Sequence, residues 1–159
     1  MYSGMVAGVT TRWLTDDEQR VWRNYLSMVG RLQTAMNRRL HQDCGLSLAD
    51  YEVLVALSEH SSLRIFELGE LLGWQQSRLS RQLGRMRARD LVDRRDDEQD
   101  GRGATVAATR AGRAALAAAA PGHVGLVRSV LFDGMTAAQL RALDVVTATA
   151  LARLADMGY

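Results

Sequence analysis

The chain has 159 residues, of which 47% are hydrophobic and 24% are charged. This length and composition fit a single globular domain, with or without appended helices, and supply enough apolar side chains for a sizeable core. We expect no membrane-spanning helix, because no apolar run approaches the roughly 20 residues that one needs, and no secretory signal between Met1 and Trp13. The one cysteine, Cys44, excludes an internal disulfide and favours a reducing cytoplasm.

The positive charge of the chain is carried by arginine alone. The formal net charge is only +2, but all 20 basic residues are arginine and none is lysine. A GC-rich genome, which favours arginine and alanine codons, accounts for most of this bias. Arginine indicates a nucleic-acid partner only where several of them gather on one surface, so their positions have to be examined.

The first predicted helix begins after Thr15, since Thr15 and Glu18 form a capping box with two further acids in the first turn. Apolar residues then recur at helical spacing over an arc wider than a coiled-coil seam. They are Val21, Trp22, Tyr25, Met28, Val29, Leu32, Met36 and Leu40. We expect this helix to pack against both its own domain and a partner chain.

Three shorter helices are predicted next. Ser47 and Asp50 give a second capping signal, which starts a short helix. Two more helices are predicted at about 65–72 and 75–89, and Gly73 between them is placed to end the first. A tight turn between two short helices is typical of a helix-turn-helix.

A β-hairpin and two further helices complete the chain. Segments 91–95 and 104–108 are predicted strands, joined by a polar tip at 96–103. Thr109 begins an alanine-rich helix that Pro121 is expected to kink or break. A last amphipathic helix is predicted from a third capping box and its apolar residues, which are Thr136, Gln139, Leu140, Leu143, Leu151 and Leu154. The terminal helices have little of their own domain to cover them, so their apolar faces predict association.

The helix at 75–89 has two faces of different chemistry. Leu79, Leu83 and Met86 fall together on a helical wheel and are predicted to face the core. The opposite side is low, because Ser77, Gly84 and Ala88 are small, and a low helix can lie deep in a major groove roughly 12 Å wide. The segment has no acid and five arginines, which are Arg78, Arg81, Arg85, Arg87 and Arg89. A solvated face would explain the arginines but not the turn and hairpin on either side of them.

These residue types predict contacts with DNA. Arginine can bind guanine with two hydrogen bonds, glutamine suits adenine, and serine contacts a base or a phosphate. The residues nearest the start of such a helix meet base edges first. The predicted contacts on this helix are Gln75, Gln76, Ser77, Arg78, Ser80, Arg81 and Arg85.

The hairpin is the second predicted contact with DNA. Arg102 lies between two glycines at the tip, where it could reach a minor groove, and Arg94 and Arg95 lie on the strand that leads to it. The acids at 96–98 would repel the DNA backbone. Either they lie in a solvated loop, which we favour, or Asp100 holds an arginine in place.

In their order and spacing, these residues resemble the multiple antibiotic resistance regulator (MarR) family, from about Thr15 to the C-terminus. The stretches that carry the resemblance are 63–68, 71–73, 77–81, 91–92, 100–102 and 108–112. The resemblance implies an obligate dimer with interleaved terminal helices. It implies recognition helices in successive major grooves of a pseudo-palindrome and wing arginines in the flanking minor grooves. It also implies that a small, often phenolic or anionic, ligand bound between the dimer and DNA-binding parts releases the DNA.

Two features depart from the family pattern. Phe66 stands where a small polar residue is common, so the start of its helix is expected to pack unusually. The peroxide-sensing branch has a reactive cysteine within the first helix, whereas Cys44 follows it with nothing placed to lower its pKa, so we do not favour oxidative sensing. A zinc site from His41, Asp43, Cys44 and His123 is also disfavoured, since their spacing forms no ligand motif.

A ligand pocket is a further prediction, weighed against plain packing in the dimer core. Aromatic and sulfur-containing side chains gather near the N-terminus, and pockets are mostly apolar with a few polar anchors. The candidates are Trp13, Trp22, Tyr25 and Met28, with Arg31 or Arg64 as an anchor for an anion. His123, next to Pro121, either lines the same pocket or caps a helix.

The sequence therefore predicts a mainly α protein with a small β-hairpin wing, a winged helix-turn-helix flanked by dimerisation helices at both ends. We expect one domain over 1–159, with the DNA-binding part at 47–108 and the dimerisation helices at 15–44 and 109–159. No nucleotide loop, metalloprotease motif or nucleophile elbow is present, so we expect neither an enzyme nor a cofactor. The alternative function is a helical-dimer interaction module that has lost DNA binding, but acids would then be expected among the arginines.

Overall fold

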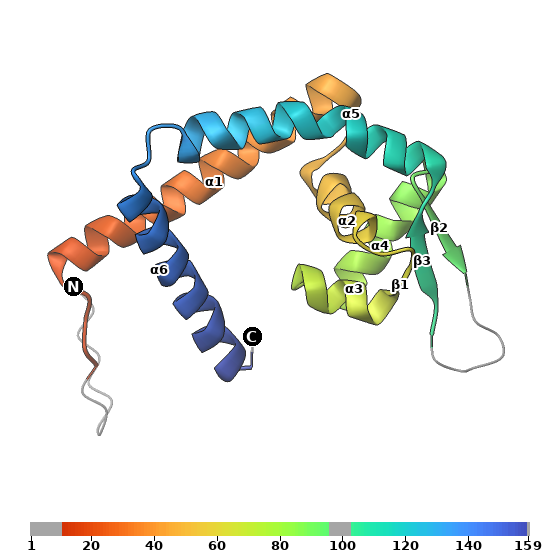
Figure 1. Ribbon diagram of the computed structural model, residues 1–159. Helices are drawn as coiled ribbons and strands as arrows, with labels where there is room; N and C mark the ends of the chain where they lie inside the picture. Colours follow the sequence, from red (N-terminus) through yellow and green to blue (C-terminus); the bar gives the residue numbers. More distant parts are fainter. Residues whose placement is uncertain (1–10, 96–102, 159) are drawn as a thin grey trace. The chain divides into compact units, whose positions relative to one another are not determined.

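A computed structural model describes residues 11–95 and 103–158 (Figure 1). These residues are mostly helical and include one small antiparallel sheet. The chain divides into two compact units, Met1–Ala35 and Met36–Tyr159. Helix α1 (Asp16–Cys44) begins in the first unit and ends in the second.

The second unit contains the predicted helix-turn-helix and hairpin. Its elements are α2 (Leu48–Ser58), β1 (Leu63–Arg64), α3 (Ile65–Leu72), α4 (Gln76–Ala88), β2 (Val92–Arg95) and β3 (Thr105–Ala108). The two strands of the hairpin pair as predicted, with Val92 opposite Ala108 and Arg95 opposite Thr105. Strand β1, which was not predicted, adds to the other edge of β3, so the sheet order is β1-β3-β2.

All three predicted capping boxes are confirmed. At the start of α1, the Thr15 hydroxyl and the Glu18 carboxylate each accept a hydrogen bond from the other residue's backbone N–H. Ser47 and Asp50 form the same pair at α2. Thr136 and Gln139 form it at α6 (Ala137–Asp156). Each box satisfies two backbone donors that a helix otherwise leaves without partners, which is why helices begin at these sites.

Of the two outcomes expected at Pro121, a kink or a break in the helix, the break does not occur. Helix α5 (Arg110–Val127) runs through Pro121 and continues into a π-helical segment, η1 (Arg128–Phe132). Proline removes one backbone donor, which leaves the carbonyl of Ala117 without its helical partner. Both Pro121 and Ala117 are exposed, so water can satisfy that carbonyl, and the alanines around them favour helix.

Helix α5 and segment η1 together form an apolar stretch that was not expected. The 23 helical residues Arg110–Phe132 contain an 18-residue window with a mean hydropathy of 1.4, so the segment is long and apolar enough, by length and composition, to cross a membrane. The expectation of no membrane-spanning helix was based on the length of uninterrupted apolar runs. Alanine, valine and leucine raise the mean hydropathy of this segment even though polar residues interrupt it. Little of this segment is buried in the structure.

One hydrophobic core lies under α2, α3, α4 and the sheet, which gather together in Figure 1. Its largest fully buried side chains are Leu40, Leu46, Leu54, Leu57, Leu68, Leu79, Met86, Val53 and Val106. Helix α5 enters this core so closely at Gly112 that an added Cβ would collide with the backbone carbonyl of Leu91. The N-terminal end of α5 is therefore fixed against the helix-turn-helix.

The terminal helices differ from this core in their exposure. Helix α6 has no buried residue, and α1 has only Leu40. Large apolar side chains are exposed along both helices and include Val21, Trp22, Tyr25, Leu26, Leu140, Val145, Val146, Leu151 and Leu154. Such an extent of apolar surface is unusual for a monomer in water and marks a surface for association.

Candidate DNA-binding surface

The turn between α3 and α4 is built around a left-handed glycine. Gly73 has φ 63°, and its N–H donates to the carbonyl of Glu70, while the N–H of Trp74 donates to that of Gly69. This pattern satisfies the last carbonyls of α3 and turns the chain sharply. Gln75 is extended and starts α4, so the predicted helix-turn-helix is confirmed.

Helix α4 turns its apolar face inward, as its sequence predicts. Leu79, Leu83 and Met86 are buried. The predicted contact residues are all exposed and are Gln75, Gln76, Ser77, Arg78, Ser80, Arg81 and Arg85. The outward surface of α4 is therefore cationic, contains no acid and is low at Gly84 and Ala88.

Arg78 is held over an aromatic ring. Its guanidinium carbon lies 3.9 Å from the centre of the Trp74 ring, which is cation–π geometry. The carboxyl of Glu52 on α2 lies near the same arginine. Burial raises the pKa of Glu52, and the charge of Arg78 opposes that rise. Trp74 and Glu52 therefore restrict a side chain predicted to meet DNA.

Two further arginines on α4 contact their own helix. The Nε of Arg81 donates to the backbone carbonyl of Ser77 at 3.2 Å. The Nη2 of Arg85 donates to the side-chain Oε1 of Gln82. Gln82 itself is buried, at 3% exposed, and faces the core beside the leucines. Sequence reasoning missed it, although a polar residue on an apolar helix face is the signal of a buried hydrogen bond.

Asp50 is the buried partner of Gln82 and was expected only to cap α2. The Gln82 amide and Nη1 of Arg89 both donate to its carboxylate, at 2.7 and 2.8 Å. Burial would raise the pKa of Asp50, but hydrogen bonds from the Ser47 backbone, from Arg89 and from the Ser47 hydroxyl outweigh it and lower the pKa below its usual value. Arg89 is thus part of the scaffold under α4.

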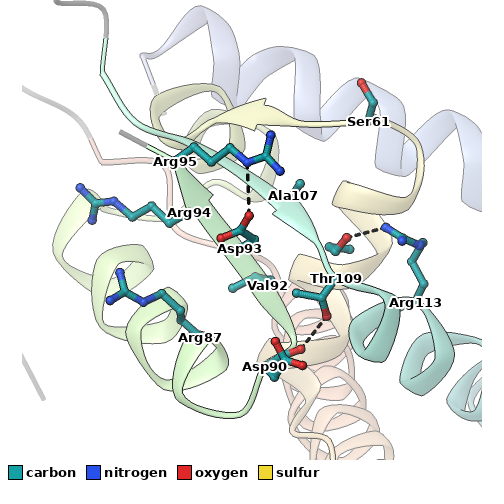
Figure 2. A pocket seen from close by; sticks show the side chains of 11 residues that line it. Ser61, Arg87, Asp90, Val92, Asp93, Arg94, Arg95, Ala107, Thr109 and Arg113 are labelled. Carbon is teal, nitrogen blue, oxygen red and sulfur yellow. Dashed lines mark hydrogen bonds and ion pairs between the residues drawn. The ribbon is translucent and has the colours of Figure 1, made fainter. Parts of the chain in front are cut away.

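The base of the wing forms a polar hollow of about 750 Å³ (Figure 2). Arg87 from α4, Arg94 and Arg95 from β2, and Arg113 from α5 all line it. Arg95 is paired with Asp93 at 3.3 Å, and Nη1 of Arg113 donates to the carbonyl of Ala108 at 2.5 Å. Arg94 and Arg95 are exposed, as DNA contacts require, whereas Arg102 lies outside the described residues.

The predicted ligand residues fall in different units. Trp13, Trp22, Tyr25, Met28 and Arg31 belong to the first unit, and Arg64 and His123 belong to the second. Within the first unit, the rings of Trp22 and Tyr25 stack with centres 5.7 Å apart. Their side chains are about half exposed, so this cluster is an exposed apolar surface.

His123 lines a cavity of about 440 Å³ in the second unit. Its ring lies 4.3 Å from that of Tyr51, and its Nδ1 is buried without a hydrogen-bond partner. Burial lowers the pKa of His123 and raises that of Tyr51, so both are neutral near pH 7. The lining is mostly apolar but includes the carboxylates of Glu52 and Glu59.

Two smaller expectations concern Cys44 and Phe66. Cys44 was expected to follow the first helix but is the last residue of α1, and its thiol donates to the carbonyl of Leu40 at 3.1 Å. Within residues 11–95 and 103–158, no group of three His, Cys, Asp or Glu side chains is placed to hold a metal ion. The expected unusual packing at Phe66 is wrong, because its side chain extends into solvent and is 63% exposed.

Three solved structures are similar to nearly the whole chain. Sco3205, a MarR family transcriptional regulator from Streptomyces coelicolor solved in complex with DNA, is 34% identical, with a TM-score of 0.85 and 91% of each chain covered. AbsC, a MarR family regulator from the same organism, is 35% identical, with a TM-score of 0.85 and coverage of 92% of this chain and 99% of AbsC. A MarR family regulator from Silicibacter pomeroyi is 30% identical, with a TM-score of 0.72 and coverage of 89% and 96%.

The MarR family model matches residues 45–103, and no curated protein matches the chain. The helix-turn-helix, the paired strands and the flanking helices define a winged helix-turn-helix protein. With two relatives above 30% identity over nine-tenths of its length, the chain belongs to the MarR family of transcriptional regulators.

Proposed function

We propose that this protein binds a pseudo-palindromic DNA operator as a homodimer and represses transcription there. One observation carries the proposal: α4 has a buried apolar face and an outward face with arginines, small residues and no acid. Its relative Sco3205, at 34% identity, was solved in complex with DNA. Repression follows from position, because a dimer seated on a promoter blocks the polymerase.

The proposed contacts divide into two kinds. Arg78, Arg81 and Arg85 on α4 would read base edges in a major groove, together with Gln75, Gln76, Ser77 and Ser80. The wing arginines Arg94, Arg95 and Arg102 would contact phosphates or a minor groove. In this arrangement, residues 47–108 form the DNA-binding part. A protein that binds operator DNA in this way would act in the cytoplasm.

The terminal helices, 15–44 and 109–159, are the proposed dimer interface. Leu151 on α6 is 67% exposed and Val130 on η1 is 55% exposed. A second copy that covers these side chains would remove a large apolar area from water, and such burial contributes about 25 cal/mol per Å². Two-fold symmetry of the protein would match a two-fold operator.

A selection of bound sequences from random DNA tests the proposal. The expected result is a roughly palindromic motif, bound with an affinity that falls as salt rises, since phosphate contacts release counterions. Sedimentation of the same sample should show a dimer at micromolar concentration. A folded protein that enriches no sequence at low salt would contradict DNA recognition and favour an interaction module.

An aromatic effector is also proposed, at the cavity beside Tyr51 and His123. Its volume of about 440 Å³ is within the usual range for small ligands. Glu52 and Glu59 line it, and no arginine is among its described lining residues, so a neutral or cationic aromatic suits it better than an aromatic acid. Benzylamine, benzyl alcohol and salicylate, titrated against the protein–operator complex, separate these classes. Release by salicylate alone would contradict the charge argument.

A further inference from the structure

A buried carboxylate under α4 connects three parts of the chain. Asp50 caps the first turn of α2 and is 2% exposed. Its Oδ1 accepts from Nε2 of Gln82 at 2.7 Å, and its Oδ2 accepts from Nη1 of Arg89 and from the backbone N–H of Ser47, both at 2.8 Å. Nη2 of Arg89 also donates to the carbonyl of Gly45, just after α1.

This carboxylate fixes which way the Gln82 amide points. An ionised carboxylate has acceptors only, so the Gln82 NH₂ group must face Asp50. The amide oxygen then points away from Asp50, toward Arg85, whose Nη2 donates to it. If the amide were reversed, its NH₂ group would face the donors of Arg85, and both contacts would be lost.

We propose that Asp50 and Gln82 are positioning residues that hold the Arg85 guanidinium in one orientation for DNA binding. The inference rests on the proposed DNA-binding function. Arg85 lies on the exposed side of α4, while Gln82 and Asp50 are buried beneath it, so neither of them reaches the DNA. A long side chain that is already ordered loses less rotamer freedom on binding, which increases affinity without a new contact.

Gln82→Met is the central variant. Methionine keeps the unbranched stem and helix propensity but has no group that can bond Asp50 or Arg85. Asp50 keeps its bonds to Arg89 and Ser47. Binding to the selected operator should weaken about 3- to 10-fold, the size of one net hydrogen bond, whereas binding to random-sequence DNA should change less.

A double-mutant cycle distinguishes positioning from a general loss of structure. Arg85→Ala removes the side chain that Gln82 orients, so adding Gln82→Met to it should weaken operator binding no further. Arg81→Ala is the matched control, because Arg81 bonds the Ser77 carbonyl and not Gln82. In the Arg81→Ala background, Gln82→Met should weaken operator binding as much as it does in the wild type.

A second variant covers the case in which Gln82→Met does not fold, as judged by urea denaturation. Asp50→Asn keeps the shape of the side chain and lets the Gln82 amide rotate. It should therefore weaken operator binding in the wild-type background and have no further effect in the Arg85→Ala background. Equal losses in the wild-type, Arg81→Ala and Arg85→Ala backgrounds would overturn the inference alone. A wild-type protein that prefers no DNA sequence would overturn the proposed function and the inference with it.

Discussion

Helices α4 and α6 are both amphipathic, but their apolar faces lie in different surroundings. On α4, Leu79 and Met86 are completely buried by α2, α3 and the sheet. On α6, Leu140 and Leu151 are 48% and 67% exposed, and no residue of the helix is buried. The helix-turn-helix is thus completed by its own chain, whereas α6 has an apolar face that a second copy would cover. Sequence periodicity finds both faces and does not distinguish them.

The largest expected effect is on the core under α4. Leu83→Ala should lower the free energy of unfolding by about 2–5 kcal/mol, because it leaves a cavity among well-packed side chains. Urea denaturation measures it. The matched change Leu151→Ala, on α6, should instead weaken the dimer in sedimentation experiments. If the two variants exchanged their phenotypes, the assignment of the two faces would be wrong.

The Asp50 network gives the next largest effect. Asp50→Ala removes a cap and leaves the buried Gln82 amide without its acceptor, so a loss of about 2–4 kcal/mol in the free energy of unfolding is expected at pH 7. Leu151→Ala again serves as the comparison. No residue of α6 is buried, so this variant should leave no buried polar group without a hydrogen bond.

The same residue predicts a pH dependence. Because the pKa of Asp50 is lower in the folded protein than its ordinary value of about 3.9, its contribution to stability is complete above that pH. The contribution is lost as the pH falls through the lower, folded-state pKa. Asp50→Asn should therefore flatten the stability profile below about pH 4. A profile as steep as that of the wild type would show that other carboxylates cause the acid sensitivity.

Arg81→Ala tests the outward face of α4. Operator binding should weaken by about 1–3 kcal/mol and preference should relax at one base position in each half-site, because a base contact is lost. Arg95→Ala on β2 should weaken binding to most sequences similarly and reduce the salt slope by about one. Neither variant should unfold, since both side chains are exposed. Unchanged affinity and base preference in Arg81→Ala would mean that another face meets DNA.

The smallest effect is expected at Asp90, which follows α4 with φ 57°. The left-handed conformation is strained for residues with a Cβ and unstrained for glycine. Glycine also increases the conformational entropy of the unfolded chain, which offsets part of the gain. Asp90→Gly should therefore raise the free energy of unfolding by no more than about 1 kcal/mol. The backbone carbonyl that accepts from the Thr109 hydroxyl is retained. Asp90→Ala is the control and should destabilise the protein.

Much of the fold and of the candidate DNA-binding surface could be predicted, because it depends on neighbours within a few residues. Capping at Thr15, Ser47 and Thr136 is a contact between residues three apart, and the buried stripe of α4 follows from helical spacing. The exposure of Arg81 and Arg85 follows from the same wheel. Strand β1 was missed because two residues carry no periodicity, and it exists only through pairing with β3.

The sequence alone therefore determined the order of the α-helices and of the hairpin, the helix-turn-helix, and which face of α4 is polar, since these are set by local hydrogen bonds and by the helical period. Only the tertiary structure decided that Arg89 and Gln82 meet Asp50, more than 30 residues away along the chain. The physical reason is distance in sequence: a buried carboxylate needs donors, but which side chains supply them depends on how the helices pack.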